Sequence, residues 1–486
     1  MSSAPANLAA RLKSLLDASR VVADPAACAD YAVDEKVPAA VAKPVSAEEA
    51  AEMVRFAALE KLAIIPCGNR TKLGIGMPPS RYDVALDMTG LHQIAHYDPA
   101  DLTLSVDAGF SLGKLNAALF EHHQFLPLLV PYYSLATIGG TIASGIDSPL
   151  RQFYGAARDF LIGAEFIDGK GNLCKSGGRV VKNVTGYDLH KLLIGSLGTL
   201  AVITRLNFRT FPSPPASRGL VASFPSAEGA LALRRAISES PLNPLTLDVL
   251  SPGMAQIFAT RTPATPEVAV FSEENRATGP DSLPRVGDWF RPREWQLCAA
   301  FAGTPEVRER YARELSRFAE QSRATSTVIL DDTSRPSLWG RLRESLSMLI
   351  EASPATAVFK ISVLPAGHPA LFADLHEIAE RTGFAHALVA RASGTIYFAL
   401  LPASANAETA NSLAAASSQI FESVSASGGP APADRGHATL FLAPPALKKR
   451  LNISGPPRSD LALVRRLKSA FDPQNIFAPG RFVGDF

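Results

Sequence analysis

Cysteine is scarce in this sequence. Only four cysteines occur in 486 residues, and Cys28, Cys67, Cys174 and Cys298 stand far apart. No C-x-x-C pair is present, so the spacing excludes a zinc ribbon and an iron–sulfur site. We expect buried, reduced thiols in a cytoplasmic protein.

Blocks of like charge and long apolar runs are missing as well. The 48 Lys and Arg residues balance 46 Asp and Glu residues, and the formal net charge is +2. This balance argues against a nucleic-acid partner. No charge-free apolar run reaches the roughly 18 residues of a membrane span, and the N-terminal segment lacks the apolar core of a signal peptide. We expect no direct membrane insertion, although association with a membrane through partner subunits stays open.

Two common nucleotide-binding motifs are also absent. The P-loop pattern G-x-x-x-x-G-K-[ST] does not occur. The nearest approach to G-x-G-x-x-G is Gly74 and Gly76, which meet Pro79 where the third glycine should stand. The sequence therefore argues against a Rossmann nicotinamide site.

The segments that are present predict an α+β protein. An amphipathic helix is expected over 7–18, and a β-α-β opening follows, with a helix over 47–61 that begins at Ser46 and has Glu49 as its capping-box partner. Strand patterns follow at 84–88 and 102–109. Residues 165–177 predict a hairpin whose turn is Asp168-Gly169-Lys170-Gly171, because an Asp-Gly pair supplies the positive φ of such turns.

A proline- and serine-rich segment at 211–219 predicts a domain boundary. Before it we expect a helical segment at 1–36 and a first domain at 37–212. After it, repeats of strand, helix and strand over 213–460 predict an antiparallel sheet covered by helices on one side. The proline-rich stretch near 261–294 is expected to be a surface insertion.

Glycines of the first half gather in three clusters. The cluster from Gly68 to Gly74 could direct backbone N–H groups at a phosphate, with Arg70 and Lys72 adding charge, or it could be an ordinary surface turn. Residues 131–145 have small side chains, so their backbone could approach a flat ring with free N–H groups; a tightly packed helix start fits equally well. Residues 195–204 are a glycine turn that enters an apolar strand, or plain core.

Five segments in this order carry a resemblance to a known family. They are YAVDEKVPAAVAKPVSAEEAAEMVRFA, PCGNRTKLGIG, TIGGTIASGIDSPLRQFYGAARDFLIGAEFIDGKG, VVKNVTGYDLHKLLIGSLGTLAVIT and FDPQNIFAPGRF. Residues 37–212 resemble the FAD-binding domain of the vanillyl-alcohol oxidase (PCMH-type) superfamily. The whole chain resembles the FAD-binding subunits of bacterial glycolate oxidases.

The resemblance implies a PCMH-type FAD-binding domain of two subdomains, an α+β cap or substrate domain, and a C-terminal segment at 461–486 that returns to the FAD domain. It implies noncovalent FAD, because covalently flavinylated relatives carry a histidine near the first loop and none lies between Cys67 and Leu91. The implied FAD-binding residues are Gly68, Asn69, Arg70, Thr71, Lys72, Leu73, Thr137, Gly139, Gly140, Ser144, Gly145, Lys182, Asn183, Gly198, Thr199, Val202 and Ile203.

The implied activity is oxidation of a 2-hydroxy acid, glycolate to glyoxylate, with hydride transfer to FAD. Such chemistry needs a base for the hydroxyl proton and a cation for the carboxylate. Weak candidates are His190, Lys360, Arg391 and Tyr397, together with Arg341 and Arg343, and each could instead be a core or solvated residue. The H-x-G-D-G-N-type segment with which some relatives bind a metal is missing, so no metal is expected.

The implied partners are a small 2-hydroxy acid, a second flavoprotein subunit and an iron–sulfur subunit. Two alternatives stay open. The chain could be a self-sufficient FAD-linked oxidoreductase for another hydroxy acid or alcohol, such as D-lactate, or a flavin-binding assembly subunit without catalysis.

Overall fold

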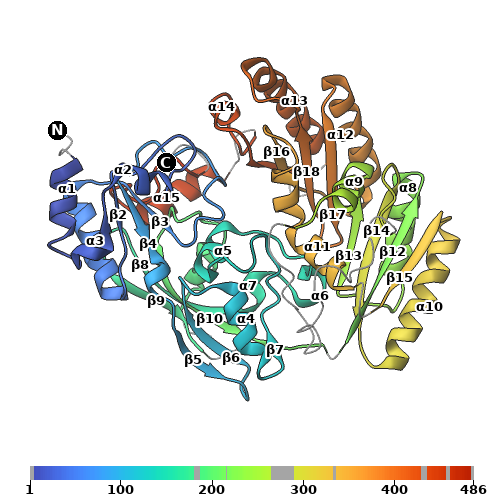
Figure 1. The fold of residues 1–486 in the computed structure, drawn as a ribbon, viewed down its shortest axis with the longest axis horizontal. Helices are drawn as coiled ribbons and strands as arrows, with labels where there is room; N and C mark the ends of the chain where they lie inside the picture. Colours follow the sequence, from blue (N-terminus) through green and yellow to red (C-terminus); the bar gives the residue numbers. More distant parts are fainter. Residues whose placement is uncertain are drawn as a thin grey trace.

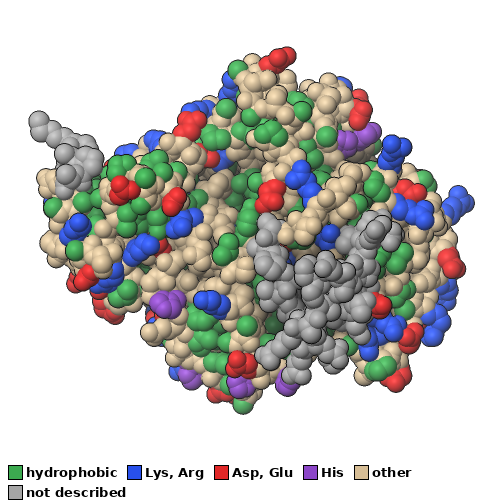
Figure 2. Space-filling view, viewed as in Figure 1, with side chains coloured by type: hydrophobic (Ala, Val, Ile, Leu, Met, Phe, Trp, Pro, Cys, Tyr) green, Lys and Arg blue, Asp and Glu red, His purple; other side chains and the backbone are tan. Residues whose placement is uncertain are grey.

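The computed structural model describes residues 5–179, 186–214, 216–263, 289–331, 335–427, 435–455 and 460–482. Two domains lie side by side (Figure 1), the first built on two small sheets and the second on one large sheet. Acidic and basic side chains are interspersed over the face shown in Figure 2. Lys182 and Asn183 lie outside the described residues, as does most of the insertion expected near 261–294. Trp289 and Phe290, at the end of that stretch, are buried.

The first sheet of the first domain is a short α/β unit with strand order β1-β2-β4-β3. It contains β1 (Val21–Val22), β2 (Ala40–Ala42), β3 (Ile64–Cys67) and β4 (Val84–Asp87), with β2 and β3 parallel to β4. Helix α3 (Ala47–Glu60) connects β2 to β3, as the β-α-β pattern predicts. Ser46 caps α3 by accepting from the Glu49 amide, while the Glu49 carboxylate accepts from the Val45 amide rather than from Ser46. The capping box is thus displaced by one residue.

The second sheet is antiparallel, with strand order β5-β6-β10-β8-β9. Its strands are β5 (Ile94–Asp98), β6 (Thr103–Asp107), β8 (Leu161–Ile167), β9 (Leu173–Gly177) and β10 (Val202–Arg209). Pairing of β8 with β9 confirms the hairpin. The positive φ, however, falls on Gly171 at 79° and not on Gly169.

Short helices complete the first domain. They are α1 (Pro5–Leu12), η1 (Ala18–Arg20), α2 (Pro25–Ala29), η2 (Met88–Gly90), α4 (Leu112–Phe120), α5 (Ile138–Ser144), α6 (Arg151–Tyr154), α7 (Ala157–Phe160) and η3 (Leu189–Leu193), and β7 (Gln124–Phe125) pairs with β11 (Phe211–Pro212). The helix expected over 7–18 is shorter than predicted. The Ser14 hydroxyl donates to the Arg11 carbonyl, a local bond that competes with helix continuation.

The second domain is an eight-stranded antiparallel sheet with strand order β15-β12-β14-β13-β17-β18-β16-β19. Its strands are β12 (Ser217–Phe224), β13 (Thr246–Leu250), β14 (Trp295–Ala302), β15 (Ser326–Leu330), β16 (Ala357–Ser362), β17 (Ala385–Arg391), β18 (Thr395–Leu401) and β19 (His437–Leu442). Its helices are α8 (Ala227–Ser238), α9 (Pro252–Thr260), α10 (Pro305–Gln321), α11 (Arg335–Ile350), η7 (Pro365–Gly367), α12 (His368–Thr382), α13 (Ala407–Ala426) and α14 (Pro445–Lys448).

Both faces of this large sheet are buried. Apolar side chains on one face, such as Leu220 and Leu297, pack under α8, α10, α12 and α13. Alternate side chains, such as Val221 and Cys298, point to the other face, where they share one core with α9, α11 and the first domain. The expected α+β class with a helix-covered antiparallel sheet is confirmed, and the second face presses the sheet against the first domain.

The chain returns to the first domain through α15 (Leu461–Phe471). The Ile64 amide donates to the Ile476 carbonyl at 2.7 Å, and the Ala478 amide donates to the Ile64 carbonyl at 2.8 Å. The Lys468 ammonium, buried and paired with Asp472, also donates to the Thr199 carbonyl. Residues 460–482 therefore complete the edge of the first sheet beside β3.

Candidate functional site

A cavity opens where β3 ends. We call it the loop cavity; it is lined by the turn from Gly68 to Leu73, by Thr137, Gly140 and Ser144 of the α5 segment, and by Leu197, Gly198 and Arg481. A side chain at position 68 would collide with Thr137, so glycine lets the turn lie directly on the start of α5. Arg70 has a positive φ of 61° and stacks its guanidinium on Tyr31 at 4.3 Å.

The turn presents unpaired amides to this cavity. Within the described part of the chain, the backbone N–H groups of Asn69, Arg70, Thr71 and Lys72 have no hydrogen-bond acceptor. The Asn69 side chain instead ties the turn to the Leu135 carbonyl at 2.7 Å. Consecutive free amides on a fixed turn form an anion-binding concavity.

Lys72 adds a buried ammonium to the same turn. Burial lowers the pKa of Lys72 to about 7, and the Glu344 carboxylate opposes this by raising it. Its Nζ donates to the Thr71 hydroxyl, 3.1 Å away. A bound anion would raise the pKa of Lys72 and hold it charged.

A second cavity, which we call the glycine cavity, adjoins the loop cavity. It is lined by Met88, Ala108, Gly139, Ala201 and Ile203, and it shares Gly68, Thr137, Gly140 and Gly198 with the loop cavity. A Cβ at Gly139 would lie 2.7 Å from the Ala108 Cβ. The close approach of α5 to β6 therefore requires glycine there.

The free N–H groups expected from residues 131–145 are not found at the start of α5. The Ile138 amide donates to the Phe110 carbonyl, the Gly139 amide to the Ala108 carbonyl, and the Gly140 amide to the Thr137 hydroxyl. Of the two interpretations left open for this segment, the structure therefore supports the tightly packed helix start, which is bonded to the β6–α4 connection. The free donors lie on the turn after β3 instead.

Two further cavities lie between the domains. The β19 cavity, about 220 Å³, is lined by Gly145, Leu197, Lys360, His437, Thr439 and Arg481 among others. The Arg151 cavity, about 360 Å³, is lined by Gly145, Asp147, Arg151, Lys191 and Lys360 among others. Neighbouring cavities share lining residues. The four cavities therefore follow one another from the end of β6, past the turn after β3, to the sheet of the second domain, and we call this row the cavity chain.

Arg481 stands where the loop cavity meets the β19 cavity. Its side chain is 3% exposed and donates from Nη2 to the Leu73 and Ile75 carbonyls, at 2.8 and 2.5 Å. Among the residues that the structure describes, its buried Nε and Nη1 have no hydrogen-bond partner. Unpaired guanidinium donors in the interior are costly, so this geometry suits an anionic ligand.

Lys360 reaches from β16 to the first domain. Its Nζ donates to the Gly145 carbonyl at 2.9 Å and lies 5.6 Å from the centre of the Phe441 ring. Burial lowers its pKa, while Asp147 opposes this and Arg151 adds to it. Of the catalytic candidates, Lys360 is the one that lines the interdomain cavities.

The other candidates are held in packing contacts. His190 is buried against the Ser176 hydroxyl, and burial lowers its pKa. Arg391 pairs with Asp248 at 2.9 Å, and the Tyr397 hydroxyl accepts from the Asp147 amide at 3.2 Å. Arg341 donates to the Phe258 carbonyl. None of these four lines the described cavities.

Arg343 helps to join the domains. It pairs with Glu344 at 3.0 Å and lies over the Tyr133 ring. Glu344 in turn accepts from the Tyr132 amide at 2.8 Å. This contact fixes α11 against the segment that precedes α5.

Most of the expected FAD-binding residues come together. Lining the cavities are Gly68, Asn69, Arg70, Thr71, Lys72, Leu73, Thr137, Gly139, Gly140, Ser144, Gly145, Gly198 and Ile203. Thr199 and Val202 do not line them; Thr199 holds the turn through Ser196, and Val202 packs in the core with Ile167. Arg481 was missed, and its only sequence signal was its place in FAPGRF.

The cavity chain suits an extended dinucleotide. A pyrophosphate would lie midway along the cavity chain, in the loop cavity. There the positive charge comes from the free amides, Lys72 and Arg481. The glycine cavity supplies an apolar slot at one end, and the interdomain cavities leave room at the other. The residues present therefore fit FAD.

Comparison with known proteins agrees with this geometry. Residues 38–177 match the family described as FAD binding domain, and residues 213–482 match the family described as FAD linked oxidases, C-terminal domain. The chain therefore belongs to the FAD-linked oxidases. It is an oxidoreductase with FAD as its cofactor, as the resemblance implied.

Curated relatives make the relationship more specific. The chain is 24% identical to glycolate oxidase subunit GlcD of Bacillus subtilis (strain 168), over 92% of this chain and 89% of that protein. It is 37% identical to glycolate oxidase subunit GlcE of Escherichia coli (strain K12), over 35% of this chain and 48% of that protein. A D-lactate dehydrogenase of Archaeoglobus fulgidus is 31% identical over 39% of this chain and 43% of its own length. Apart from GlcD, these matches span about half of each relative or less.

Solved structures share the fold. p-Cresol methylhydroxylase with substrate bound has a TM-score of 0.74 at 18% identity, covering 98% of this chain and 96% of its own. 4-Ethylphenol oxidase from Gulosibacter chungangensis in its isoeugenol complex has a TM-score of 0.72 at 15% identity, with the same two coverages. The PCMH-type architecture expected from the sequence is confirmed.

No helix among the described residues is long and apolar enough to cross a membrane.

Proposed function

We propose that this chain oxidises a small 2-hydroxy acid, with glycolate as the first candidate, as the FAD-bearing subunit of a glycolate oxidase-type complex. The observation that carries the proposal is the half-buried ammonium of Lys360 at the junction of the domains. The names of the relatives, glycolate oxidase subunits and a D-lactate dehydrogenase, support the substrate class.

Lys360 would bind the substrate carboxylate. Its Nζ donates to a backbone carbonyl, which is uncharged, so a bound acid would supply the countercharge. Between the two interdomain cavities it can orient a two- or three-carbon acid toward the cavity chain. Burial in a water-poor cavity strengthens this pairing.

FAD held at this site would supply the two-electron chemistry, as the acceptor of a hydride from the substrate C–H bond. The first-domain residues would hold the cofactor without a covalent bond. The amides of the turn after β3, Lys72 and Arg481 would bind the pyrophosphate, and Gly139 and Gly140 would allow close approach.

The test uses the full chain purified alone and together with candidate partner subunits. We expect bound flavin by its visible absorption and release of unmodified FAD on denaturation. Under anaerobic conditions, glycolate, D-lactate and D-2-hydroxyglutarate are each mixed with the protein, and bleaching of the flavin band is followed. We expect glycolate to bleach it, faster with partners present, while a protein without flavin bands would overturn the proposal.

Lys360→Met provides the residue-level test. Loss of a charged hydrogen bond worth about 1.5–3 kcal/mol should raise the substrate concentration needed for half-maximal bleaching by roughly 10- to 100-fold. Lys175, a 63% exposed side chain on β9, gives the matched control Lys175→Met. Equal behaviour of the two variants would contradict the role of Lys360.

The partners are proposed on the same basis. Relatives named as glycolate oxidase subunits favour assembly with a second flavoprotein subunit, and we add an iron–sulfur subunit as electron acceptor. Co-purification from a strain that expresses all three tests this. Rapid turnover by the isolated chain with an artificial acceptor would instead support the self-sufficient enzyme, for which the D-lactate dehydrogenase relative speaks. Bound flavin that no hydroxy acid reduces, even with partners, would indicate the assembly subunit.

A further inference from the structure

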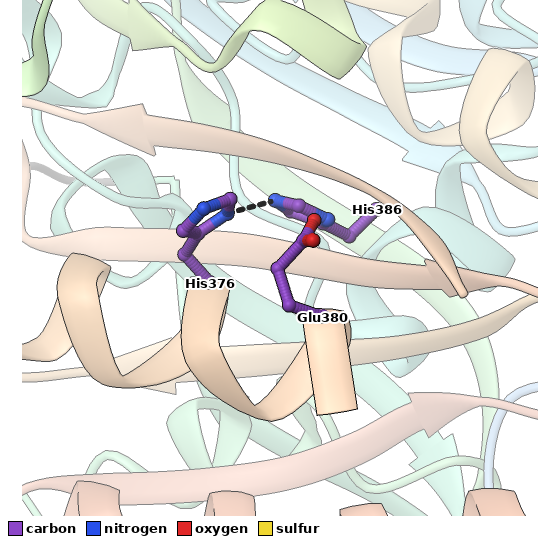
Figure 3. A group of neighbouring side chains, drawn as sticks. All are labelled: His376, Glu380 and His386. Carbon is purple, nitrogen blue, oxygen red and sulfur yellow. Dashed lines mark hydrogen bonds between the residues drawn. The ribbon is translucent and has the colours of Figure 1, made fainter. Parts of the chain in front are cut away.

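We propose that His376, Glu380 and His386 form a binding site for a divalent transition metal ion, of the zinc class, on the second domain away from the flavin cavities. Figure 3 shows the two imidazoles pointing toward each other, with the Glu380 carboxylate beside the His386 ring. One ligand atom from each of the three side chains lies within 4.8 Å of the other two.

Local structure brings these residues together. His376 and Glu380 are four residues apart on α12, so they project from the same face of the helix. The helix ends at Thr382, and Gly383 follows in the left-handed conformation with a φ of 66°. The tight turn lets β17 begin at Ala385, which places His386 over the last turns of α12.

The spacing of the imidazoles matches a metal site. His376 Nδ1 and His386 Nε2 are 3.2 Å apart. Two nitrogens bound to one tetrahedral zinc at about 2.0–2.1 Å are separated by about 3.3–3.4 Å. An ion can therefore bind both nitrogens with little movement, and the exposed Glu380 side chain is free to rotate its carboxylate toward it.

The surroundings of His386 favour the ligand form of its imidazole. Burial lowers the pKa of His386, and the neighbouring His376 lowers it further, while Glu380 and a hydrogen bond with the Phe384 backbone act in the opposite direction. A neutral imidazole is the form that binds a metal. A backbone hydrogen bond on a ligating ring is the usual outer-shell contact that fixes its orientation.

The site stands apart from the flavin cavities. None of its three residues lines the four cavities described above. Two imidazoles and a carboxylate suit zinc, cobalt, nickel or copper better than magnesium or calcium, which prefer oxygen ligands. A bound ion would join the C-terminal end of α12 to the start of β17.

The experiment uses the tag-free, flavin-loaded full chain. Zinc and cobalt are titrated separately, and the bound metal is counted after gel filtration. We expect one ion per chain, visible cobalt d–d absorption in the difference spectrum against metal-free protein, and a rise in melting temperature of about 3 °C or more at saturating zinc. Magnesium should produce none of these effects.

Variants test the assignment. His376→Ala and His386→Ala should each weaken zinc binding at least about 100-fold, and Glu380→Gln at least about tenfold. His92 and His96 are also four residues apart, but they lie in a loop and on β5, so His92→Ala/His96→Ala serves as the control. We expect the control to bind zinc like the unmodified chain.

Two results would overturn the proposal. One is an unmodified chain that takes up no more zinc than His376→Ala, which would mean that the two histidines merely share a hydrogen bond. The other is unchanged binding in all three site variants, which would place the metal elsewhere. Because both readouts are independent of substrate oxidation, neither depends on the proposed activity.

Discussion

Arg481 shows how much of the site depends on a single side chain. Its guanidinium is buried, and two of its nitrogens have no partner within the described part of the chain. It lines the same cavity as the glycine turn, which lies far away in the sequence. A cation in this position lowers the free energy of any anion bound in the loop cavity.

Arg481→Met should weaken FAD binding. The variant keeps a long apolar stem but loses a charged donor worth about 1.5–3 kcal/mol, so the dissociation constant should rise by roughly 10- to 100-fold. Equilibrium dialysis of FAD against the apoprotein measures this. Arg218 lies on β12 and pairs with Glu309 of α10 at the surface. Arg218→Met is the control and should bind FAD normally. Normal binding by both variants would remove Arg481 from the cofactor site.

The sequence predicts those site residues whose roles depend on the backbone. The resemblance implies Gly68, Gly139 and Gly140 as site residues. The glycine turn at Gly68 can direct backbone N–H groups at a phosphate, and the small residues around Gly139 and Gly140 permit close approach. Each of the three lines the cavity chain. Arg481 and the group around His376 could not be found in this way. Their neighbours come from distant segments or from the opposite side of a turn, which no local pattern encodes.

At the scale of elements, α8 and α12 are joined by an unusual contact. Arg234 donates to His368 Nδ1 at 2.8 Å, and both side chains are buried. Burial, reinforced by Arg234, lowers the pKa of His368 to about 4. The imidazole is therefore neutral in the folded protein and serves as an acceptor.

This contact should make stability sensitive to acid. The unfolded chain takes up the His368 proton near pH 6.5 and the folded chain only near pH 4, so stability present above pH 6.5 is lost as the pH falls between these values. The loss should approach about 3 kcal/mol at pH 4. Urea unfolding of the chain and of His368→Gln, which keeps an acceptor but cannot titrate, measures the difference between pH 7 and pH 4.5. His92→Gln is the exposed control, and parallel pH profiles for all three proteins would refute the assignment.

The positions of helices and strands follow from the sequence better than the order in which the strands pair. The strand at 64–67, the helix capped by Ser46 and the hairpin of β8 and β9 follow from local patterns and appear in the structure. The strand order of the large sheet does not follow from such patterns. Pairing of β13 with β17, for example, joins residues that are distant in sequence, and only tertiary packing selects it.

For the whole molecule, the decisive contact is the one between the domains. Asp147 accepts from Arg151 at 3.0 Å and from the Ser393 hydroxyl at 3.1 Å, and its amide donates to the Tyr397 hydroxyl. Arg151 also donates to Thr395. These bonds hold the segment after α5 against β18 and the turn that precedes it.

Asp147→Ala should loosen this contact. Loss of its hydrogen bonds should lower the free energy of unfolding by about 1–3 kcal/mol. It should also expose the bound flavin, so iodide should quench flavin fluorescence more strongly. Asp188→Ala, which breaks an exposed pair with Lys191, should change stability by less than about 0.5 kcal/mol and leave quenching unaltered. Equal quenching in the two variants would show that Asp147 does not govern access to the cofactor.

The pairing of residues 476–478 with β3 also has a consequence during synthesis. The first sheet lacks its final partner until the ribosome has made the whole second domain and the segment beyond it. Because that segment reaches back over some 400 residues, closing it is a slow, late step in folding. The β3 edge of the nascent first domain therefore stays uncovered while the eight-stranded sheet folds.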